Sequence, residues 1–229
     1  MPTRNSPPVP RSPARRSWAG VSPTDRQAER RSLLLDAAFE LLGTVGSAAT
    51  TVRAVCARAR LNPRYFYESF ESLDDLIVAV YDQVVDDLGH DVVAALESAG
   101  DDATQQMAAV VRSTVEFVDE DRRRARVLYM EALDNEALNR RRIETGHAVV
   151  AFVEAAAAER HGDLPAGEPI GRVGAAVLVG GFGGLLVAWL EGRIDVSRQQ
   201  LIEDATELFL ALGDAAAGIA ARRGRRSRR

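Results

Sequence analysis

The sequence predicts an all-α protein: an N-terminal head of three helices, a larger helical C-terminal domain, and about nine helices in total. Three observations favour this class. Apolar residues recur at spacings of three and four along most of the 229 residues. No stretch alternates apolar and polar residues as a half-buried strand does. Alanine, the strongest helix former, is abundant.

Composition divides the chain into four parts. Residues 1–23 hold six of the nine prolines, with arginine and serine between them, and cannot bury a core. We therefore expect a disordered arm there, either simply solvated or gripping DNA along its backbone or minor groove. Residues 24–71 form the head, 72–221 the larger domain, and 222–229 a basic tail with six arginines in eight residues. That tail is either solvated or adds affinity for phosphate groups.

Periodicity gives the helices in order. The first is expected from about residue 24 to 44, where Leu34, Ala38, Leu41 and Leu42 share one face. Gly43 lies in its last turn and favours termination of the helix there. A long helix should run over 72–96, with Ser72 as its cap. Further helices are expected at 102–119, 122–134, 137–161, 168–192 and 197–221.

Residues 50–70, TTVRAVCARARLNPRYFYESF, predict two short helices joined by a tight turn. Thr50 or Thr51 is suited to cap the first helix, since a threonine hydroxyl accepts a bond from a free backbone N–H there. Asn62 is suited to cap the second, and Pro63 would occupy its first position, where a missing N–H costs nothing.

The second short helix has the features of a DNA-reading helix. Phe66 and Phe70 lie four apart and should pack inward, which leaves Arg64, Tyr65 and Tyr67 on the other faces. Residues 51–70 carry four arginines against one acid, whereas residues 71–100 carry eight acids and no arginine. A basic head on an otherwise acidic chain is typical of a local DNA contact made by a helix-turn-helix.

The segment from Arg30 to Leu76 resembles the DNA-binding domain of the tetracycline-repressor-like (TetR-type) regulators. LLDAAFELLGTVG (34–46), TTVRAVCARARL (50–61), YFYESF (65–70) and SLDDL (72–76) carry the resemblance. The family usually has glycine where Arg60 stands, and a lysine that reaches a phosphate where Leu73 stands. The resemblance implies that the Tyr67 hydroxyl contacts a phosphate. It also implies a homodimer on an inverted-repeat operator of double-stranded DNA, most simply a repressor released by a small ligand.

From motif and resemblance together we expect one set of DNA-contacting residues: Thr50, Thr51, Arg53, Asn62, Pro63, Arg64, Tyr65, Tyr67 and Ser72. Arg64 is the candidate base reader, and Arg53 a candidate phosphate contact.

Residues 173–190 form an apolar run of eighteen residues without a charge. Its length reaches the threshold of a membrane span, but its glycines and alanines favour a helix buried in protein, with two backbones in close approach. TetR-type proteins dimerise through their last two helices, and the resemblance extends to this region. The expected interface comprises Gly180, Gly184, Leu186, Trp189, Leu201, Ala205, Leu208 and Phe209.

The resemblance also implies a small-molecule cavity among the middle helices, coupled to the helix that begins at Ser72. Candidate lining residues are Met107, Val111, Phe117, Tyr129, Met130, His147, Val150 and Phe152, each of which could equally be ordinary core.

Nothing in the sequence marks an enzyme or a cofactor site. The three histidines lack metal-ligand spacing, and no phosphate-binding glycine loop follows a strand. The single cysteine and the absence of an apolar signal region suit the cytoplasm. We therefore expect a sequence-specific regulator and not an enzyme, with no cofactor and no membrane. Two alternatives remain: a helical small-molecule binder or enzyme with a vestigial head, and a nonspecific DNA-binding protein that uses its arginine tails.

Overall fold

The computed structural model describes residues 23–131, 135–161 and 169–227. Within these ranges all regular structure is helical, which confirms the predicted all-α class. The helices are α1 (Pro23–Thr44), α2 (Val52–Ala59), α3 (Pro63–Tyr67), α4 (Leu73–Ala99), α5 (Ala103–Glu120), α6 (Arg122–Ala125), α7 (Glu136–His161), α8 (Ile170–Leu190) and α9 (Arg198–Ser227). A 3₁₀ turn (Ser47–Ala49) precedes α2, and a π-helical turn (Arg126–Met130) follows α6.

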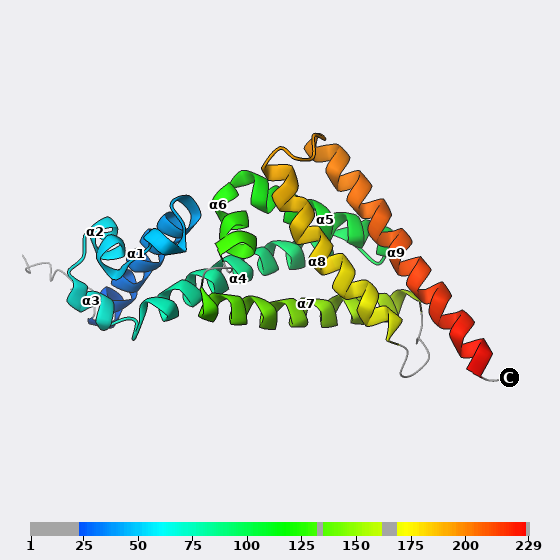
Figure 1. Cartoon of the computed structure of the whole chain (residues 1–229), viewed down its shortest axis with the longest axis horizontal. Coiled ribbons are helices and arrows are strands. Elements are labelled where there is room, and N and C mark those ends of the chain that lie inside the picture. The colour runs from blue at the N-terminus through cyan, green and yellow to red at the C-terminus, as the bar shows by residue number, and fades with distance from the viewer. Residues whose placement is uncertain (1–22, 132–134, 162–168, 228–229) are drawn as a thin grey trace, which may run out of the picture.

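Helices α1 to α3 form a small head at one end of the molecule, and α4 runs from the head into the larger body (Figure 1). In the body, α4 packs against α5 and α7, while α8 packs against α7 and α9. The end of α1 lies beside α6, which gives the head a second contact with the body besides α4. Helix α3 and the C-terminal end of α9 lie at opposite ends of the long axis (Figure 1).

The head folds around the apolar row predicted on α1. Leu34, Ala38 and Leu42 are almost fully buried and belong to one cluster with Val55 of α2 and Phe66 of α3. Removing such side chains from water stabilises a fold by about 25 cal/mol per Å² of apolar surface, so this shared core fixes the angle between α2 and α3.

The predicted caps are present where each short helix begins. Thr51 Oγ1 accepts a bond from the Ala54 N–H (3.1 Å), and Asn62 Oδ1 accepts one from the Arg64 N–H (2.9 Å). Ser72 caps α4 by accepting from the Asp75 N–H (3.1 Å). Each cap satisfies an N–H that has no partner within the helix, typically worth about 1 kcal/mol.

Two expected helices differ in the structure. The helix expected over 122–134 is a four-residue α6 followed by the π-helical turn, and residues 132–134 lie outside the described residues. The last helix was expected to end at 221, but α9 continues to Ser227, so Arg222, Arg223, Arg225 and Arg226 are helical. Alanine and arginine are both strong helix formers, which explains the continuation. Residues 1–22 of the predicted arm and the last two residues also lie outside the described residues, whereas Pro23 is the first residue of α1.

Candidate nucleic-acid interface

The starts of α2 and α3 together present the exposed polar side chains of the head. Thr51 and Arg53 lie exposed at the start of α2. Asn62, Pro63 and Arg64 lie exposed at the start of α3, and the Arg64 side chain is 82% exposed. The caps described above hold both helix starts in place. Hydrogen-bond donors and positive charge therefore project from the end of the molecule farthest from α9 (Figure 1).

Two aromatic side chains fix α3 from behind, as predicted. Phe66 is fully buried and Phe70 is 6% exposed, with their ring centroids 5.9 Å apart. Tyr67 packs edge-on against Phe66 at 5.2 Å, yet it remains 64% exposed. Its hydroxyl is thus carried at a fixed position on the surface, which suits a phosphate contact.

The charges of this face are partly paired. Arg64 Nε donates to Glu68 Oε1 (3.0 Å), and Arg30 Nη2 lies 3.6 Å from the other oxygen of that carboxylate. Arg58 forms an ion pair with Glu40. Arg53 has no ion pair with any residue that the structure describes. Of the two arginines of α2, it can therefore bind a phosphate without first breaking an ion pair.

Two residues of the expected DNA-contacting set do not lie on the exposed face. Thr50 is 2% exposed, and its hydroxyl donates to the Gly46 carbonyl (2.8 Å), so this assignment is corrected. The reason is that Thr51 occupies the cap position, which turns the preceding side chain inward. Tyr65 is half-buried, with the Arg30 guanidinium 4.5 Å above its ring.

Sequence reasoning missed the part that α1 contributes to this site. Gln27 donates to the Glu68 carbonyl (3.2 Å), and Arg30 faces both Tyr65 and the Glu68 carboxylate. Arg30 Nε and Ser69 Oγ are buried beside α3 and have no hydrogen-bond partner among the described residues. Gln27, Arg30 and Arg31 lie at helical spacing, but α1 carries four acids against three arginines, so counting charge along this helix would not have found their role.

The turn between α2 and α3 depends on an unusual backbone conformation. Arg60 has φ 55° and ψ 38°, the left-handed region, and its N–H bonds back to α2. Glycine adopts this region without strain, which explains the family's usual residue at this position. The turn therefore forms with arginine, at a conformational cost.

The expected ligand-lining residues do not come together. Val111 and Phe117 are in the core, whereas Met130, His147 and Phe152 are exposed on the surface. Met107 and Val150 are half-buried, and Tyr129 packs against Gly183 of α8. The inward face of α7 is set by its packing against α4 and α8, through residues such as the fully buried Leu138, and this turns the other side of the helix to solvent.

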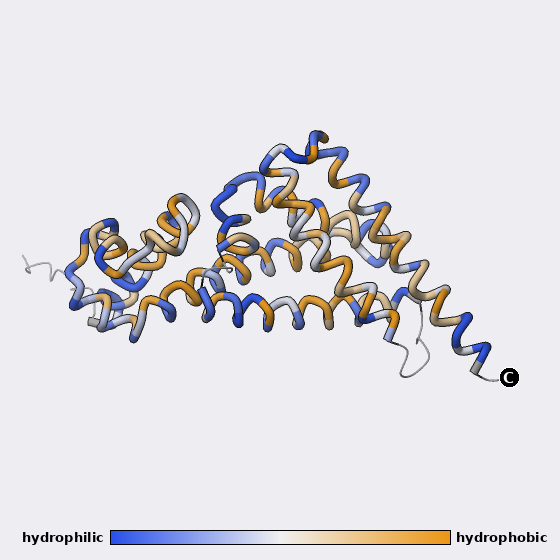
Figure 2. Tube along the Cα trace, viewed as in Figure 1, coloured by the Kyte–Doolittle hydropathy of each residue, from blue (hydrophilic) through white to orange (hydrophobic). Residues whose placement is uncertain are grey.

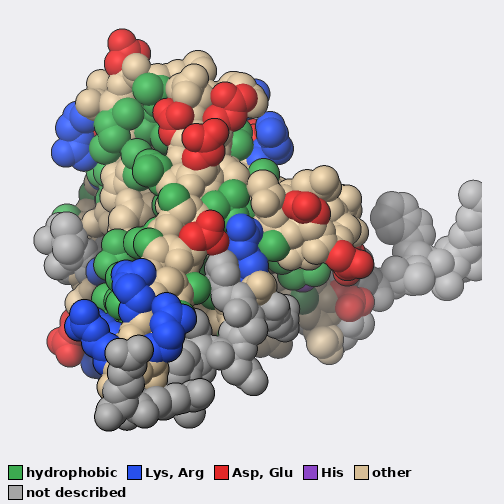
Figure 3. Space-filling model, turned by 90° about the vertical axis from the view of Figure 1, so that its right-hand side faces the viewer, with side chains coloured by type: hydrophobic (Ala, Val, Ile, Leu, Met, Phe, Trp, Pro, Cys, Tyr) green, Lys and Arg blue, Asp and Glu red, His purple; other side chains and the backbone are tan. Residues whose placement is uncertain are grey.

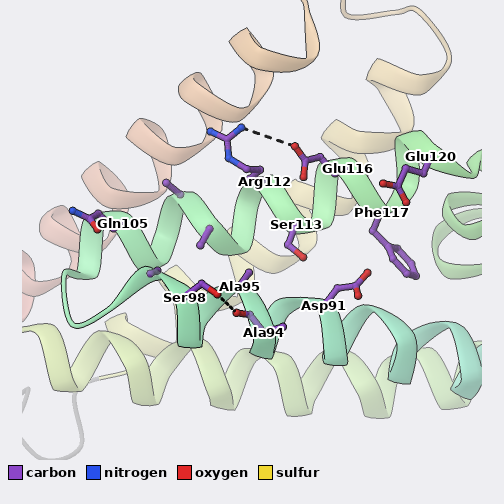
Figure 4. A pocket seen from close by; sticks show the side chains of 13 residues that line it. Asp91, Ala94, Ala95, Ser98, Gln105, Arg112, Ser113, Glu116, Phe117 and Glu120 are labelled. Carbon is purple, nitrogen blue, oxygen red and sulfur yellow. Dashed lines mark hydrogen bonds and ion pairs between the residues drawn. The ribbon is translucent and has the colours of Figure 1, made fainter.

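A different hollow lies between α4 and α5 (Figure 4). It is an open groove of about 590 Å³. Alanines of both helices line it, with Asp91, Ser98, Arg112 and Glu116 at its edges (Figure 4). Phe117 alone of the expected pocket residues lines this groove.

The expected dimer residues divide into two groups. Leu186, Leu201 and Ala205 are buried inside the protomer at 0%, 3% and 1% exposure, so their assignment to the interface is corrected. Trp189 is half-buried and donates its indole N–H to the Val196 carbonyl (3.0 Å), and Phe209 is half-buried against Phe182. Gly180, Gly184 and Leu208 remain exposed.

The exposed apolar surface of α8 is extensive. Val173 and Val177 are 52% and 59% exposed, and with Gly180 and Gly184 they follow one face of the helix. Apolar residues run along the whole of α8 in Figure 2. Among the described helices, α8 alone has the length and composition to cross a membrane, with a mean hydropathy of 2.1 and 17% of the window buried. Figure 3 shows apolar side chains above a group of basic ones at the end of the body.

Capped helix starts, a buried aromatic support and exposed donors define a helix-turn-helix DNA-binding head on a helical body. Residues 34–80 match the model of the bacterial regulatory proteins of the tetR family. The head is therefore that of the tetR family, and the chain is a DNA-binding regulator with the TetR-type fold. No curated protein sequence matches it.

Solved structures share this fold. A protein from Pseudomonas aeruginosa PAO1 named as a transcriptional regulator has a TM-score of 0.69 at 19% identity, over 90% of this chain and 98% of its own. The regulator FadR from Bacillus subtilis, solved with stearoyl-CoA, has a TM-score of 0.64 at 17% identity, over 78% of this chain and 96% of its own. The multidrug-binding protein EbrR, solved with imidazole, has a TM-score of 0.61 at 27% identity, over 82% of this chain and 92% of its own.

Proposed function

We propose that this protein is a homodimeric repressor that binds an inverted-repeat operator and is released by a small-molecule effector. The observation that carries the proposal is the exposed, capped start of α3, with Arg64 and Tyr67 outward and Phe66 and Phe70 locked behind. A helix held in this way enters a major groove without first having to order itself. Such a protein acts on DNA in the cytoplasm and needs no cofactor or catalytic step.

Each exposed residue of the head has a role in this proposal. Arg64 reads a base edge and Arg53 contacts a phosphate, since arginine donors match guanine acceptors as well as phosphate oxygens. Tyr67 donates its hydroxyl to a phosphate. Thr51, Asn62 and Ser72 stand at exposed helix starts, where the helix dipole favours an anion. Thr50 has no role in the interface.

The second part of the proposal is the dimer. The exposed row on α8 (Val173, Val177, Gly180 and Gly184) and Leu208 of α9 would pair with the same surface of a second copy. A two-fold axis then places two α3 helices in successive major grooves about 34–36 Å apart. This pairing accounts for the apolar surface of α8 without a membrane.

The third part concerns the effector. We place it in the groove between α4 and α5, because α4 leads directly from Ser72 beside α3 into that groove. A ligand that changes the packing of α4 would change the angle of the head, provided that it binds the two arrangements with different affinity. FadR holds an acyl thioester and EbrR an imidazole, so the relatives do not define one ligand chemistry.

Selection of bound sequences from random DNA tests the proposal, followed by electrophoretic shift with the selected site. We expect an inverted repeat, with weaker binding by Arg64→Ala that relaxes preference at one base pair and by Arg53→Ala at all sequences. A selection that yields no consensus would favour a nonspecific DNA-binding protein. No shift with any duplex would indicate a vestigial head.

A further inference from the structure

A polar cluster joins the segment just before α2 to a body segment 84 residues further along the chain. It consists of the loop after α1 on the head side and of the π-helical turn with Glu131 on the body side. Glu131 Oε2 accepts the Ser47 backbone N–H at 2.5 Å. Glu131 Oε1 accepts the Arg126 Nε–H at 2.6 Å, and Arg126 Nη1 donates to the Thr44 carbonyl at 2.6 Å. We refer to these four residues as the head tie.

The head tie restrains the position of the head relative to the body. Glu131 is 9% exposed, and its carboxylate accepts bonds from the head and from its own segment at the same time. A hydrogen bond to a charged group stabilises more than one between neutral groups, and more still is lost when one partner is left buried and alone. A carboxylate that is almost excluded from water therefore resists separation from the Ser47 N–H.

The backbone on the head side is adapted to this contact. Gly46 has φ 88°, a conformation that L side chains rarely adopt. A Cβ at Gly46 would also lie 2.9 Å from Arg126 Nη2 and 3.0 Å from Glu131 Oε2. One turn earlier, a Cβ on Gly43 would overlap the Arg123 side chain. The end of α1 and the segment 123–131 thus approach too closely for side chains at these two glycines.

The same body segment also contacts the helix that we place at the dimer surface. Tyr129 lies two residues before Glu131, and a Cβ on Gly183 of α8 would lie 3.0 Å from its ring. The π-helical turn is therefore held between the head at Glu131 and α8 at Tyr129. A π-turn inserts an extra residue into a helix and often marks a functional position.

We infer that Glu131 is a positioning residue for operator binding: through the head tie it sets the angle of each head relative to α8, and so the half-site spacing that the dimer accepts. This inference rests on the proposed function. A single protomer gains little from a fixed head angle. A dimer on two half-sites requires it, because each added base pair turns one half-site by about 35° around the DNA axis.

The test variant is Glu131→Gln, which keeps the size of the side chain but has one acceptor oxygen for two donors. The matched control is Glu136→Gln, since Glu136 is exposed and, among the described residues, forms an ion pair with Arg140 of its own helix alone. The probes are the duplex that the wild-type protein selects from random DNA, the same duplex with one base pair inserted or removed between the half-sites, and a single half-site.

For Glu131→Gln we expect about tenfold weaker binding to the selected duplex, from the loss of one charge-assisted bond. Binding to the single half-site should not change, and the preference for the selected spacing over the altered spacings should shrink by about the same factor. A head that had merely lost stability would bind the half-site less well and would keep its spacing preference. A spacing profile identical to that of the wild type and of Glu136→Gln would overturn the inference.

Hydrogen exchange tests the head tie without DNA. The Ser47 amide should exchange at least about tenfold faster in Glu131→Gln than in the wild type. Should Glu131→Gln fail to fold, Arg126→Lys keeps an ion pair with Glu131 but cannot also reach Thr44, and an intermediate spacing profile is expected. Unchanged exchange at Ser47 refutes the tie itself. A wild-type protein without sequence preference would instead refute the proposed function.

Discussion

Substitution of Gly184 by leucine separates folding of the protomer from its assembly. Gly184 is exposed on α8, and a Cβ there would meet no atom of the described residues within 4 Å. Leucine also has a higher helix propensity than glycine, by up to about 1 kcal/mol. The isolated protomer should therefore be as stable as before, or slightly more stable.

The dimer should respond in the opposite direction. Overpacking a close helix contact costs about 1–3 kcal/mol, and two-fold symmetry places the substitution twice in one interface. The sum, about 2–6 kcal/mol, corresponds to a dissociation constant raised roughly 30-fold or more. Operator affinity should fall with it, although no DNA-contacting residue has changed.

Light scattering across a concentration series measures the dimer, and electrophoretic shift measures operator binding. The matched control is Gly183→Leu, one residue earlier, because a Cβ there would lie 3.0 Å from the Tyr129 ring and should destabilise the protomer itself. A wild-type protein that is monomeric at micromolar concentration, or a Gly184→Leu variant that dimerises normally, would refute the reasoning. Sedimentation of the wild type with lipid vesicles would assign α8 to a membrane.

Further predictions concern single side chains of the head and body. Phe70→Ala should leave a cavity and destabilise the head by about 3–5 kcal/mol in chemical denaturation, whereas Tyr67→Phe should weaken DNA binding with an unchanged melting temperature. Arg60→Gly should raise the stability of the head by about 1 kcal/mol, because glycine relieves the left-handed φ; an unchanged denaturation midpoint would contradict this. Desolvation raises the pKa of Tyr129 to about 12, with a smaller contribution from Tyr81. The unfolded chain ionises first as pH rises, so stability should be complete below pH 10 and fall between about 10 and 12. Tyr129→Phe should reduce that fall without abolishing it, because desolvation also raises the pKa of Tyr81.

The head could be predicted from the sequence because its determinants are local. Caps such as Asn62, the proline that follows it and the pair Phe66 and Phe70 each specify structure within one or two helical turns. Sequence alone does not distinguish Thr50 from Thr51 as the cap of α2, since either hydroxyl could accept the bond. Only the packing of the loop after α1 shows that Thr50 bonds inward to Gly46.

The helices of the body could be predicted from the sequence, but the side chains that each helix turns toward the core or toward solvent could not. His147 and Phe152 face solvent because α7 is oriented by its contacts with α4 and α8, which lie far away in sequence. The two adjacent glycines of α8 are equivalent in sequence, yet a Cβ on Gly183 would meet Tyr129, whereas one on Gly184 would meet nothing within 4 Å in the part of the chain that the structure describes. Glu131 gave no local signal either, since its partner is a backbone N–H 84 residues away.

The exposed apolar row on α8 has a consequence for the cell. An unpaired protomer carries this row into solvent, and contiguous apolar surface of that kind invites aggregation and proteolysis. At concentrations below the dissociation constant of the proposed dimer, the amount of paired protein grows with the square of the amount of chain synthesised. Occupancy of the operator would then rise more steeply than in proportion to expression of the gene. A modest change in gene dosage would therefore produce a larger relative change in repression.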